Sequence, residues 1–325
     1  MRPFVYESPS SAQEAASHSA PDSLFIAGGT TVLDLMKLEV MNPARLVDVN
    51  ALPMRGVEMR EDGLRIGALE KMSGVALHPE IVANYPVISQ ALLQSASPQI
   101  RNMASMGGNL LQRTRCGYFR DVTTPCHKRE PGSGCSAING ENRMHAILGT
   151  SSSCVATNAS DLAVALVALD ASLQLQKGGE TRLIKLDDFY LVPGDTPERE
   201  NLLQPGELIT QILVPRLPWA RRSSYLKIRD RESYEFALTS AAVALDGDQD
   251  RIRDVRIAVG GVGTKPWNLP QVRQALVGKL FKEETITAAA KLSVAGAKPL
   301  KHNSFKVDLV QRTIVRALMN LGDLA

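Results

Sequence analysis

The chain has 325 residues, of which 44% are hydrophobic and 22% charged, with 37 Lys and Arg against 34 Asp and Glu. This length predicts about two domains with a core large enough to fold without disulfides, and the composition excludes disordered, collagenous and coiled-coil proteins. No apolar run reaches the ~18 to 20 residues of a membrane span, and a net charge of +3 without a basic stripe argues against a nucleic-acid partner.

A strand, a glycine pair and a helix are predicted between residues 24 and 41. The apolar letters LFI lead into AGGTT, and apolar residues then recur at helical spacing up to Met41. Gly28 and Gly29 allow the main chain to approach an anion closely, and the helix N-terminus attracts negative charge. The segment therefore predicts a pyrophosphate site, with a plain turn capped by Thr30 as the alternative.

A second glycine pair follows the amphipathic helix predicted over residues 86–95. The letters PQIRNMASMGGNL, residues 98–110, place Gly107 and Gly108 among small polar residues, which predicts another turn. Downstream, Ser160 is predicted to cap an apolar helix over residues 161–170. Asp161 stands at that cap, where its carboxylate can satisfy backbone amides or accept a hydrogen bond from a ribose hydroxyl.

All four cysteines lie in one window: Cys116, Cys126, Cys135 and Cys154. Cysteines that only fill a core would be scattered. We expect synthesis in a reducing compartment, where structural disulfides are rare, so this clustering favours metal or cluster ligation. The surrounding residues are rich in Gly, Pro, Ser and charge and have little periodicity, which predicts a long functional loop.

The spacing favours an iron–sulfur cluster over zinc. Nine, eight and eighteen residues separate the cysteines, whereas structural zinc sites use short CxxC-type pairs. A [4Fe–4S] cluster takes one thiolate at each of four separated irons, so it tolerates widely spaced ligands. His127 and His145 lie in the same loop, and a mixed Cys/His zinc site remains the alternative.

The remainder of the chain predicts strands over residues 172–176, 182–186 and 208–214. A linker between Pro215 and Pro218 then leads to further strands over residues 225–228, 239–245 and 255–259. The last helix is predicted from about Phe305 to Leu321, with an apolar stripe that indicates core packing. Gly260 to Gly263 is interpreted as a turn at a strand end.

Three segments resemble, in the same order, the FAD-contact segments of the flavin subunits of molybdenum hydroxylases of the xanthine dehydrogenase and carbon monoxide dehydrogenase type. They are AGGTTVLDLMK (27–37), PQIRNMASMGGNL (98–110) and ASDLAVALVALDA (159–171). The block YLKIRDR (225–231) resembles the start of the family's C-terminal domain. The cysteine loop directly after GGNLLQRTRC resembles a smaller group with an extra [4Fe–4S] cluster, found in bacterial periplasmic aldehyde oxidoreductases.

This resemblance implies an α+β fold. Residues 1–218 are expected to form a two-lobed FAD-binding domain of the PCMH, or carbon monoxide dehydrogenase flavoprotein, type. The cysteine loop 116–154 is inserted in it. Residues 219–325 are expected to form a C-terminal domain with a three-stranded sheet and helices.

The resemblance also implies the cofactor-binding residues, position by position. The loop from Ile26 to Leu33 would hold the pyrophosphate of FAD, and Asp161 the ribose or ribityl hydroxyls. Leu203 and Lys227 match positions near the isoalloxazine. The full set is Ile26, Ala27, Gly28, Gly29, Thr30, Thr31, Val32, Leu33, Ser105, Gly108, Asn109, Asp161, Leu203 and Lys227, with Cys116, Cys126, Cys135 and Cys154 as ligands of the [4Fe–4S] cluster.

The function implied is that of an electron-transfer subunit with no catalytic base or nucleophile of its own. Electrons would come from a molybdenum-cofactor subunit and a [2Fe–2S] subunit of a heterotrimeric aldehyde oxidoreductase, pass through FAD, and leave to an external acceptor. Two alternatives stand beside it. One is a self-sufficient flavin oxidoreductase with its own substrate pocket, and the other a metal-binding scaffold whose glycines are purely structural.

The compartment is expected from the resemblance and not from a targeting segment. The N-terminal letters MRPFVYESPSSAQEAASHSA contain no apolar stretch behind a basic start, so we expect no secretory signal. The resemblance implies a periplasmic location, reached as a folded passenger of a partner's twin-arginine signal. A cytoplasmic complex is the alternative.

Overall fold

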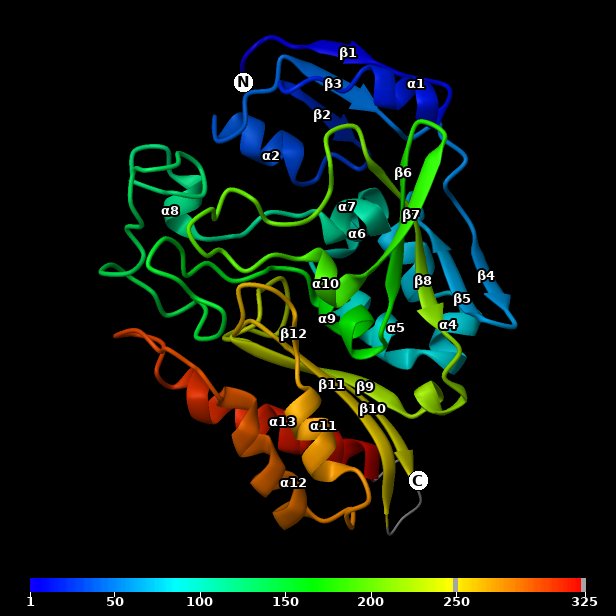
Figure 1. The fold of residues 1–325 in the computed structure, drawn as a ribbon, viewed down its shortest axis with the longest axis vertical. Helices are drawn as coiled ribbons and strands as arrows, with labels where there is room; N and C mark the ends of the chain where they lie inside the picture. Colours follow the sequence, from blue (N-terminus) through cyan, green and yellow to red (C-terminus); the bar gives the residue numbers. More distant parts are fainter. Residues whose placement is uncertain (248–250, 323–325) are drawn as a thin grey trace.

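The computed structural model describes residues 1–247 and 251–322, which form three β-sheets with helices around them (Figure 1). The N-terminal sheet is parallel, in the order β1-β3-β2. Parallel neighbouring strands need a crossover connection, and α2 connects β2 to β3 in this way. The elements are β1 Val5–Glu7, α1 Ala12–Ser17, β2 Ser23–Ile26, α2 Val32–Lys37 and β3 Arg45–Asp48.

The second sheet is antiparallel, in the order β4-β5-β8-β6-β7. Its central strand, β8, comes from far along the chain and pairs with both β5 and β6, which closes this part of the fold. Its strands are β4 Val57–Arg60, β5 Gly63–Gly67, β6 Ser172–Lys177, β7 Glu180–Lys185 and β8 Leu208–Pro215. The accompanying helices are α3 Met72–Ala76, α4 Pro79–Asn84, α5 Pro86–Leu93, α6 Pro98–Met103, α7 Met106–Leu110, α9 Asp161–Ala168 and α10 Leu186–Phe189.

The C-terminal sheet is antiparallel, in the order β12-β11-β10-β9, and three helices lie along one of its faces (Figure 1). The elements are β9 Ser223–Ile228, β10 Thr239–Gly247, β11 Ile252–Gly260, β12 Trp267–Asn268, α11 Pro270–Leu276, α12 Glu283–Ala290 and α13 Lys306–Gly322. A single-turn 3-10 segment, Pro218–Arg221, precedes β9, and another, Lys291–Val294, follows α12.

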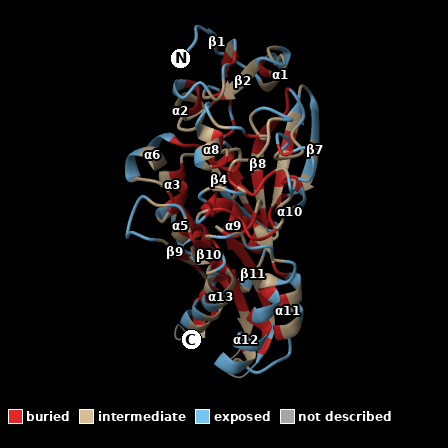
Figure 2. Cartoon of the chain, turned by 90° about the vertical axis from the view of Figure 1, so that its left-hand side faces the viewer, coloured by how far each residue is buried: buried red, intermediate tan, exposed pale blue. Residues whose placement is uncertain are grey.

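The central strand β10 is buried on both faces. Ala242 and Ala244 pack into the core that contains α5 and α9, whereas Val243 and Leu245 pack into the core that contains α13. A strand covered on both sides is apolar throughout, without polar alternation. The C-terminal sheet is therefore a shared wall between the two halves of the molecule, and Figure 2 shows the buried residues continuing across it.

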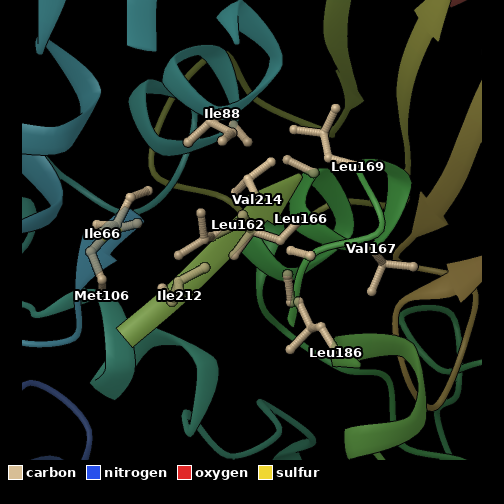
Figure 3. Packing of buried hydrophobic residues seen from close by; sticks show 14 of the residues in the cluster. Ile66, Ile88, Met106, Leu162, Leu166, Val167, Leu169, Leu186, Ile212 and Val214 are labelled. Carbon is tan, nitrogen blue, oxygen red and sulfur yellow. The ribbon is translucent and has the colours of Figure 1, made fainter. Parts of the chain in front are cut away.

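Helix α9 lies at the centre of the larger core. Every residue from Asp161 to Ala168 is buried, and Leu162 and Leu166 pack with Ile88 of α5 and Ile212 of β8 (Figure 3). A helix that is apolar all round is stable only when it is enclosed. Ser160 caps it, since its Oγ accepts a hydrogen bond from the Ala163 amide at 3.0 Å, as the sequence predicts.

The predicted α+β fold class is confirmed, with one correction in the C-terminal sheet. That sheet has four strands and not three, because Trp267–Asn268 pairs with Val259 and Ala258 of β11. A strand of two residues has no periodicity, so only tertiary pairing reveals it. The last three residues of the predicted second domain, 323–325, lie outside the described residues.

The segment that carries the cysteines has little regular structure, as predicted. Its only helix is α8, Gly117–Arg120. In Figure 1 the segment, coloured teal to green, occupies one side of the molecule between the N-terminal sheet and the C-terminal sheet. Residues 146–148 are fastened to the C-terminal half by backbone hydrogen bonds from Ile147 and Leu148 to the Val262 carbonyl.

Candidate functional site

The first glycine pair forms the turn between β2 and α2. Gly29 has a φ of +70°, a left-handed conformation that glycine adopts without strain. Gly28 lies against the segment that precedes α7, so that a Cβ on it would stand 2.2 Å from the Met103 carbonyl oxygen. The N-cap of α2 is Thr31, whose side chain makes no capping hydrogen bond. The predicted cap at Thr30 is therefore wrong.

The second glycine pair lies in a helix, which corrects the predicted turn. Ser105 is the N-cap of α7, and its Oγ accepts a hydrogen bond from the Gly108 amide at 3.2 Å. Gly107 and Gly108 have no positive φ, and the reason for glycine here is space. A Cβ on Gly107 would lie 3.1 Å from the Cβ of Ala68, and one on Gly108 would lie 2.8 Å from Ser105 Oγ.

Both glycine segments line one cavity of about 270 Å³. Of the residues predicted to bind FAD, it brings together Ala27, Gly28, Gly29, Thr30, Thr31, Val32, Ser105, Gly108 and Leu203. Ile26 and Leu33 lie instead in the apolar cluster behind the turn. Asn109 is buried, and its Oδ1 accepts a hydrogen bond from Ser160 Oγ at 2.6 Å.

Asp161 and Lys227, predicted separately, form a buried ion pair. Lys227 Nζ lies 2.8 Å from Asp161 Oδ2. Tyr225 donates its hydroxyl to Oδ1 at 2.6 Å, and Ser95 donates to Oδ2 at 3.0 Å. Burial and the Asp161 carboxylate raise the pKa of Tyr225 well above its usual value. Asp161 therefore anchors strand β9 to helices α5 and α9, and it does not cap the amides of α9.

Asp161 also lines a second cavity, of about 600 Å³. The wall of this cavity combines the cysteine segment, the N-terminus of α9 and the C-terminal sheet; its members include Cys116, His145, Ser160, Phe236 and Gly260. A 30 Å³ cavity lies between the two larger ones, because it shares Leu111 with the glycine-lined cavity and Thr157 and Asn158 with this one. Through these shared residues the three cavities lie next to one another in a row, and the cysteine segment contributes to the walls of two of them.

The four cysteines are free thiols, two of them buried and two half-buried. The backbones of Cys126 and Cys135 pair with each other in an isolated antiparallel β-bridge. Burial, with smaller contributions from the charges of Cys126 and Cys154, raises the pKa of Cys116 to about 12. Burial also raises the pKa of Cys154, as do the charges of Cys135 and Cys126. Gathered thiols of this kind fit a group that supplies positive charge to each sulfur.

A single metal ion has no site of three or more ligands among residues 1–247 and 251–322. The two histidines of the zinc alternative are placed differently. His127 Nδ1 accepts a hydrogen bond from the Gly132 amide at 3.0 Å, whereas His145 Nε2 lies 3.1 Å from Cys116 Sγ. A [4Fe–4S] cluster needs four thiolates that each bind a different iron, and not several ligands around one ion.

Ion pairs attach the cysteine segment to helix α2. Arg120 donates two hydrogen bonds to Asp34 of α2, at 2.7 and 3.1 Å, and Arg115 lies 3.3 Å from the same carboxylate. The hydrogen bonds from Arg120 lower the pKa of Asp34. Because α2 begins at the glycine turn, the cysteine segment and this turn share one charged contact.

Family models match almost the whole chain. Residues 2–217 match the FAD binding domain in molybdopterin dehydrogenase, and residues 224–321 match the CO dehydrogenase flavoprotein C-terminal domain. The aldehyde oxidoreductase FAD-binding subunit PaoB of Escherichia coli (strain K12) is 44% identical over 98% of both chains. This chain belongs to the FAD-binding subunits of the molybdenum hydroxylases.

Other members of this flavin-subunit family are more distant. The glyceraldehyde dehydrogenase medium chain of Sulfolobus acidocaldarius is 27% identical over 85% of this chain and 82% of its own length. Among solved structures, the reconstituted carbon monoxide dehydrogenase of Oligotropha carboxidovorans superposes with a TM-score of 0.79 at 21% identity, covering 100% of both chains. That likeness shows the fold. No helix in the described part of this flavin subunit is long and apolar enough to cross a membrane.

Sequence reasoning missed three residues, one that lines a cavity and two that hold Asp161, which lines another. Arg113 lines the glycine-lined cavity. Ser95 and Tyr225 complete the hydrogen bonds of Asp161. Ser95 and Tyr225 lie 66 and 64 positions from Asp161, so no local pattern pairs them. Arg113 stands within the letters GGNLLQRTRC, where its charge directly after the second glycine segment is the one available signal.

The buried ion pair gives a stability prediction for this flavin subunit. In the variant K227M, Asp161 keeps its charge in the interior but loses its cation, and breaking a buried pair in this way costs about 3–5 kcal/mol. We expect the free energy of unfolding to fall by that amount, as measured by urea denaturation with FAD in excess. R60M is the matched control, since the Arg60–Glu58 pair lies at the surface and should barely change stability. Equal effects of both variants would contradict the prediction.

A second prediction concerns Lys306 at the start of α13. Its fully buried ammonium donates to the carbonyls of His145 and Gly261, at 3.1 and 2.7 Å. Burial, with a contribution from Arg143, lowers the pKa of Lys306 to about 7. His145 adds no charge above pH 6, because burial lowers its pKa to about 4. The unfolded chain therefore binds more protons at this position than the folded chain does between pH 7 and about 10.

The stability contribution of Lys306 thus depends on pH. The full cost of burying the charge is present below pH 7, and it disappears as pH rises toward about 10, at up to about 1.4 kcal/mol per pH unit. The stability of the wild type should therefore rise with pH in this range, and we expect K306M to lack that rise. The stability of K306M relative to the wild type should then be highest at pH 6 and fall steadily toward pH 9. Urea unfolding at several pH values measures it, and K301M, at an exposed site, is the control. A pH-independent difference would contradict the prediction.

Proposed function

We propose that this chain is the flavin and [4Fe–4S] subunit of a molybdenum-containing aldehyde oxidoreductase. The observation that carries the proposal is the 44% identity to a subunit named for aldehyde oxidoreductase, over 98% of both chains. This extent includes both glycine segments and the region of the four cysteines. The relatives named as medium chains support a multi-subunit assembly.

The residues at the row of cavities fit FAD. When bound, FAD supplies the one- and two-electron chemistry that side chains lack. The amides of the Gly28–Thr31 turn would bind its phosphates, because glycine allows the backbone to approach and these amides precede the first hydrogen bonds of α2. At the start of α7 the amides of Met106, Gly107 and Gly108 already donate to the Glu70 carbonyl, the Ala68 carbonyl and Ser105 Oγ, so that segment would contribute only its small residues to the same wall. The apolar part of the same cavity includes Leu69 and Leu203, and Leu203 would lie near the isoalloxazine, as the resemblance implies. Asp161 and Lys227 would orient the far end of the cofactor.

The four cysteines would hold the cluster. Their thiols are buried or half-buried, and burial raises the pKa of Cys116 and Cys154 above the usual value. Iron ligation would favour the thiolate forms that burial alone disfavours. The segment around them contributes few residues to the core, so cluster binding would supply the order that apolar packing supplies elsewhere.

In this proposal the chain oxidises no organic substrate itself. Electrons reach it from a molybdenum-cofactor subunit and a [2Fe–2S] subunit of a heterotrimer, and an external acceptor removes them. The chain's own residues bind and orient the cofactors and keep water from them. Aldehyde specificity then resides in the molybdenum subunit.

An anaerobic visible spectrum of the purified chain, with flavin, iron, sulfide and zinc assays, is the first test. We expect flavin bands over broad iron–sulfur absorption, with about four irons per chain. Zinc in place of iron, or no metal, would remove the cluster from the proposal. Aldehyde should reduce the flavin only when the partner subunits are present. Turnover by the isolated chain would indicate a self-sufficient flavin oxidoreductase instead.

We further propose that the assembled complex works in the periplasm, where it would arrive folded with a partner that bears a twin-arginine signal. Folded export suits a protein that must receive its cofactors in the cytoplasm. Fractionation of cells that express all subunits tests this directly, with and without the twin-arginine motif of the partner. Recovery of the complex in the cytoplasm in both cases would overturn it.

A further inference from the structure

The glycine-lined cavity contains one cation that no sequence pattern assigned. Its charged lining residues, among those that the structure describes, are Arg113 and Glu207. Glu207 is already neutralised, because Arg182 donates to both of its carboxylate oxygens at 2.6 and 2.8 Å. Arg113 is therefore the one side chain of the lining that can offer positive charge to a ligand.

The guanidinium of Arg113 is held from two sides. Its Nε donates to Glu200 Oε2 at 2.8 Å, and its Cζ lies 4.7 Å from the centre of the Phe119 ring. Phe119 is fully buried beside Leu35 of α2. Neither Nη1 nor Nη2 of Arg113 has a hydrogen-bond partner among the described residues. An arginine fixed at Nε, with its remaining N–H groups at a cavity, suits an anion with several oxygen atoms.

We infer that Arg113 binds the phosphate portion of FAD and is positioned for that contact by Glu200. The inference rests on the proposed placement of the FAD phosphates at the Gly28–Thr31 turn, which lines the same cavity. Backbone amides provide only partial charges, whereas the pyrophosphate carries full negative charges. A guanidinium in the same wall supplies the compensating charge, and its planar group of donors matches phosphate oxygens.

The same arrangement connects the cysteine segment to the cofactor. Glu200 also forms an ion pair with Lys128, with 2.9 Å between Lys128 Nζ and Glu200 Oε1. Lys128 follows Cys126 by two positions, and its side chain is 10% exposed. Phe119, beneath Arg113, follows Cys116 by three positions. The position of Arg113 thus depends on a segment that the cluster would order, so the inference expects the cysteine segment to strengthen FAD binding through these two contacts.

The test compares FAD release from the full-length chains of the wild type, R113Q and R113K. Purified protein is diluted, and recovery of flavin fluorescence gives the dissociation rate at low and at high salt. A hydrogen bond to a charged group contributes about 1.5–3 kcal/mol, so R113Q should release FAD at least about tenfold faster. R113K keeps the charge and should be intermediate. Release from the wild type should accelerate with salt, and release from R113Q should respond less.

Two further variants separate the contact from general damage. R65Q removes an arginine of β5 that pairs with Asp62 and does not line the cavity. This variant should release FAD like the wild type. E200Q leaves Arg113 in the sequence but removes its anchor, and it should accelerate release less than R113Q does. Circular dichroism confirms that each variant is folded, and R113K supplies the comparison if R113Q is not.

The outcomes distinguish this inference from the proposed function. A wild-type chain without flavin would overturn the proposed FAD site and the inference together. Flavin in the wild type with wild-type release from R113Q would overturn only the role of Arg113. Loss of iron together with flavin in R113Q would assign Arg113 to the folding of the cysteine segment, and it would also overturn a phosphate contact.

Discussion

Replacement of Gly28 by alanine should give a chain that folds but fails to retain FAD. The added methyl group would stand 2.2 Å from the Met103 carbonyl oxygen and 2.9 Å from the Ala104 Cα. Both are backbone atoms that cannot rotate away, so the two glycine segments must move apart. Overpacking of this kind costs about 1–3 kcal/mol. Because the proposed phosphate site lies between these segments, we expect FAD binding to weaken at least about tenfold.

The flavin content of the purified chain and the FAD dissociation rate measure this effect. G179A is the matched control, since a Cβ on Gly179 in the β6–β7 turn meets nothing within 4 Å. That variant should keep its flavin. Wild-type flavin content in G28A would show that the contact with Met103 does not position the cofactor.

Replacement of Cys135 by serine should remove the iron–sulfur cluster. Cys135 is only half-buried, so the exchange of sulfur for oxygen costs little packing, and lost ligation dominates. We expect iron to fall from about four atoms per chain to less than one, because serine is a poor ligand for a cluster held by thiolates. The melting temperature should fall by about 5 °C or more, since cluster binding contributes directly to folding. Flavin bands should remain.

The variant S136A, at the next residue, is the control and should leave iron unchanged. Iron retained in C135S would contradict ligation by this cysteine. In the assembled complex, the rate of flavin reduction by aldehyde then distinguishes two roles of the cluster. A normal rate with lowered stability would mean that the cluster stabilises the segment, whereas a slow rate would mean that it relays electrons.

The elements with a strong local signal could be predicted from the sequence, whereas the short strands β1, β3, β4 and β5 and most of the short helices could not. The apolar helix α9 with its Ser160 cap, the hairpin of β6 and β7, and helix α13 each have a periodicity or cap within their own residues. The second glycine pair shows where local reasoning fails. Two adjacent glycines are typical of a turn, yet Gly107 and Gly108 lie in a helix. Their small size is required by Ala68 and Ser105, which are contacts that only packing creates.

The candidate site divides in the same way. The predicted residues Ala27–Val32, Ser105, Gly108 and Leu203 meet in one cavity, although the roles assigned to them stay predictions. Asp161 and Lys227 could each be identified by position, but not as partners in one ion pair. Arg113, Glu200 and Lys128 could not be connected at all, because Arg113 and Glu200 stand 87 positions apart and charged residues are common throughout the chain.

The sequence by itself determined the family, the candidate FAD-binding segments, the four candidate cluster ligands and those helices and strands that have a strong periodicity of their own. These features depend on residue type, spacing and short-range backbone preference. Only the tertiary structure decided which distant segments press together. It set Gly28 against Met103, bound Asp161 to Tyr225 and Lys227, and placed Arg113 beside the glycine-lined cavity. Such contacts follow from the burial of side chains across the whole core, and no local pattern encodes them.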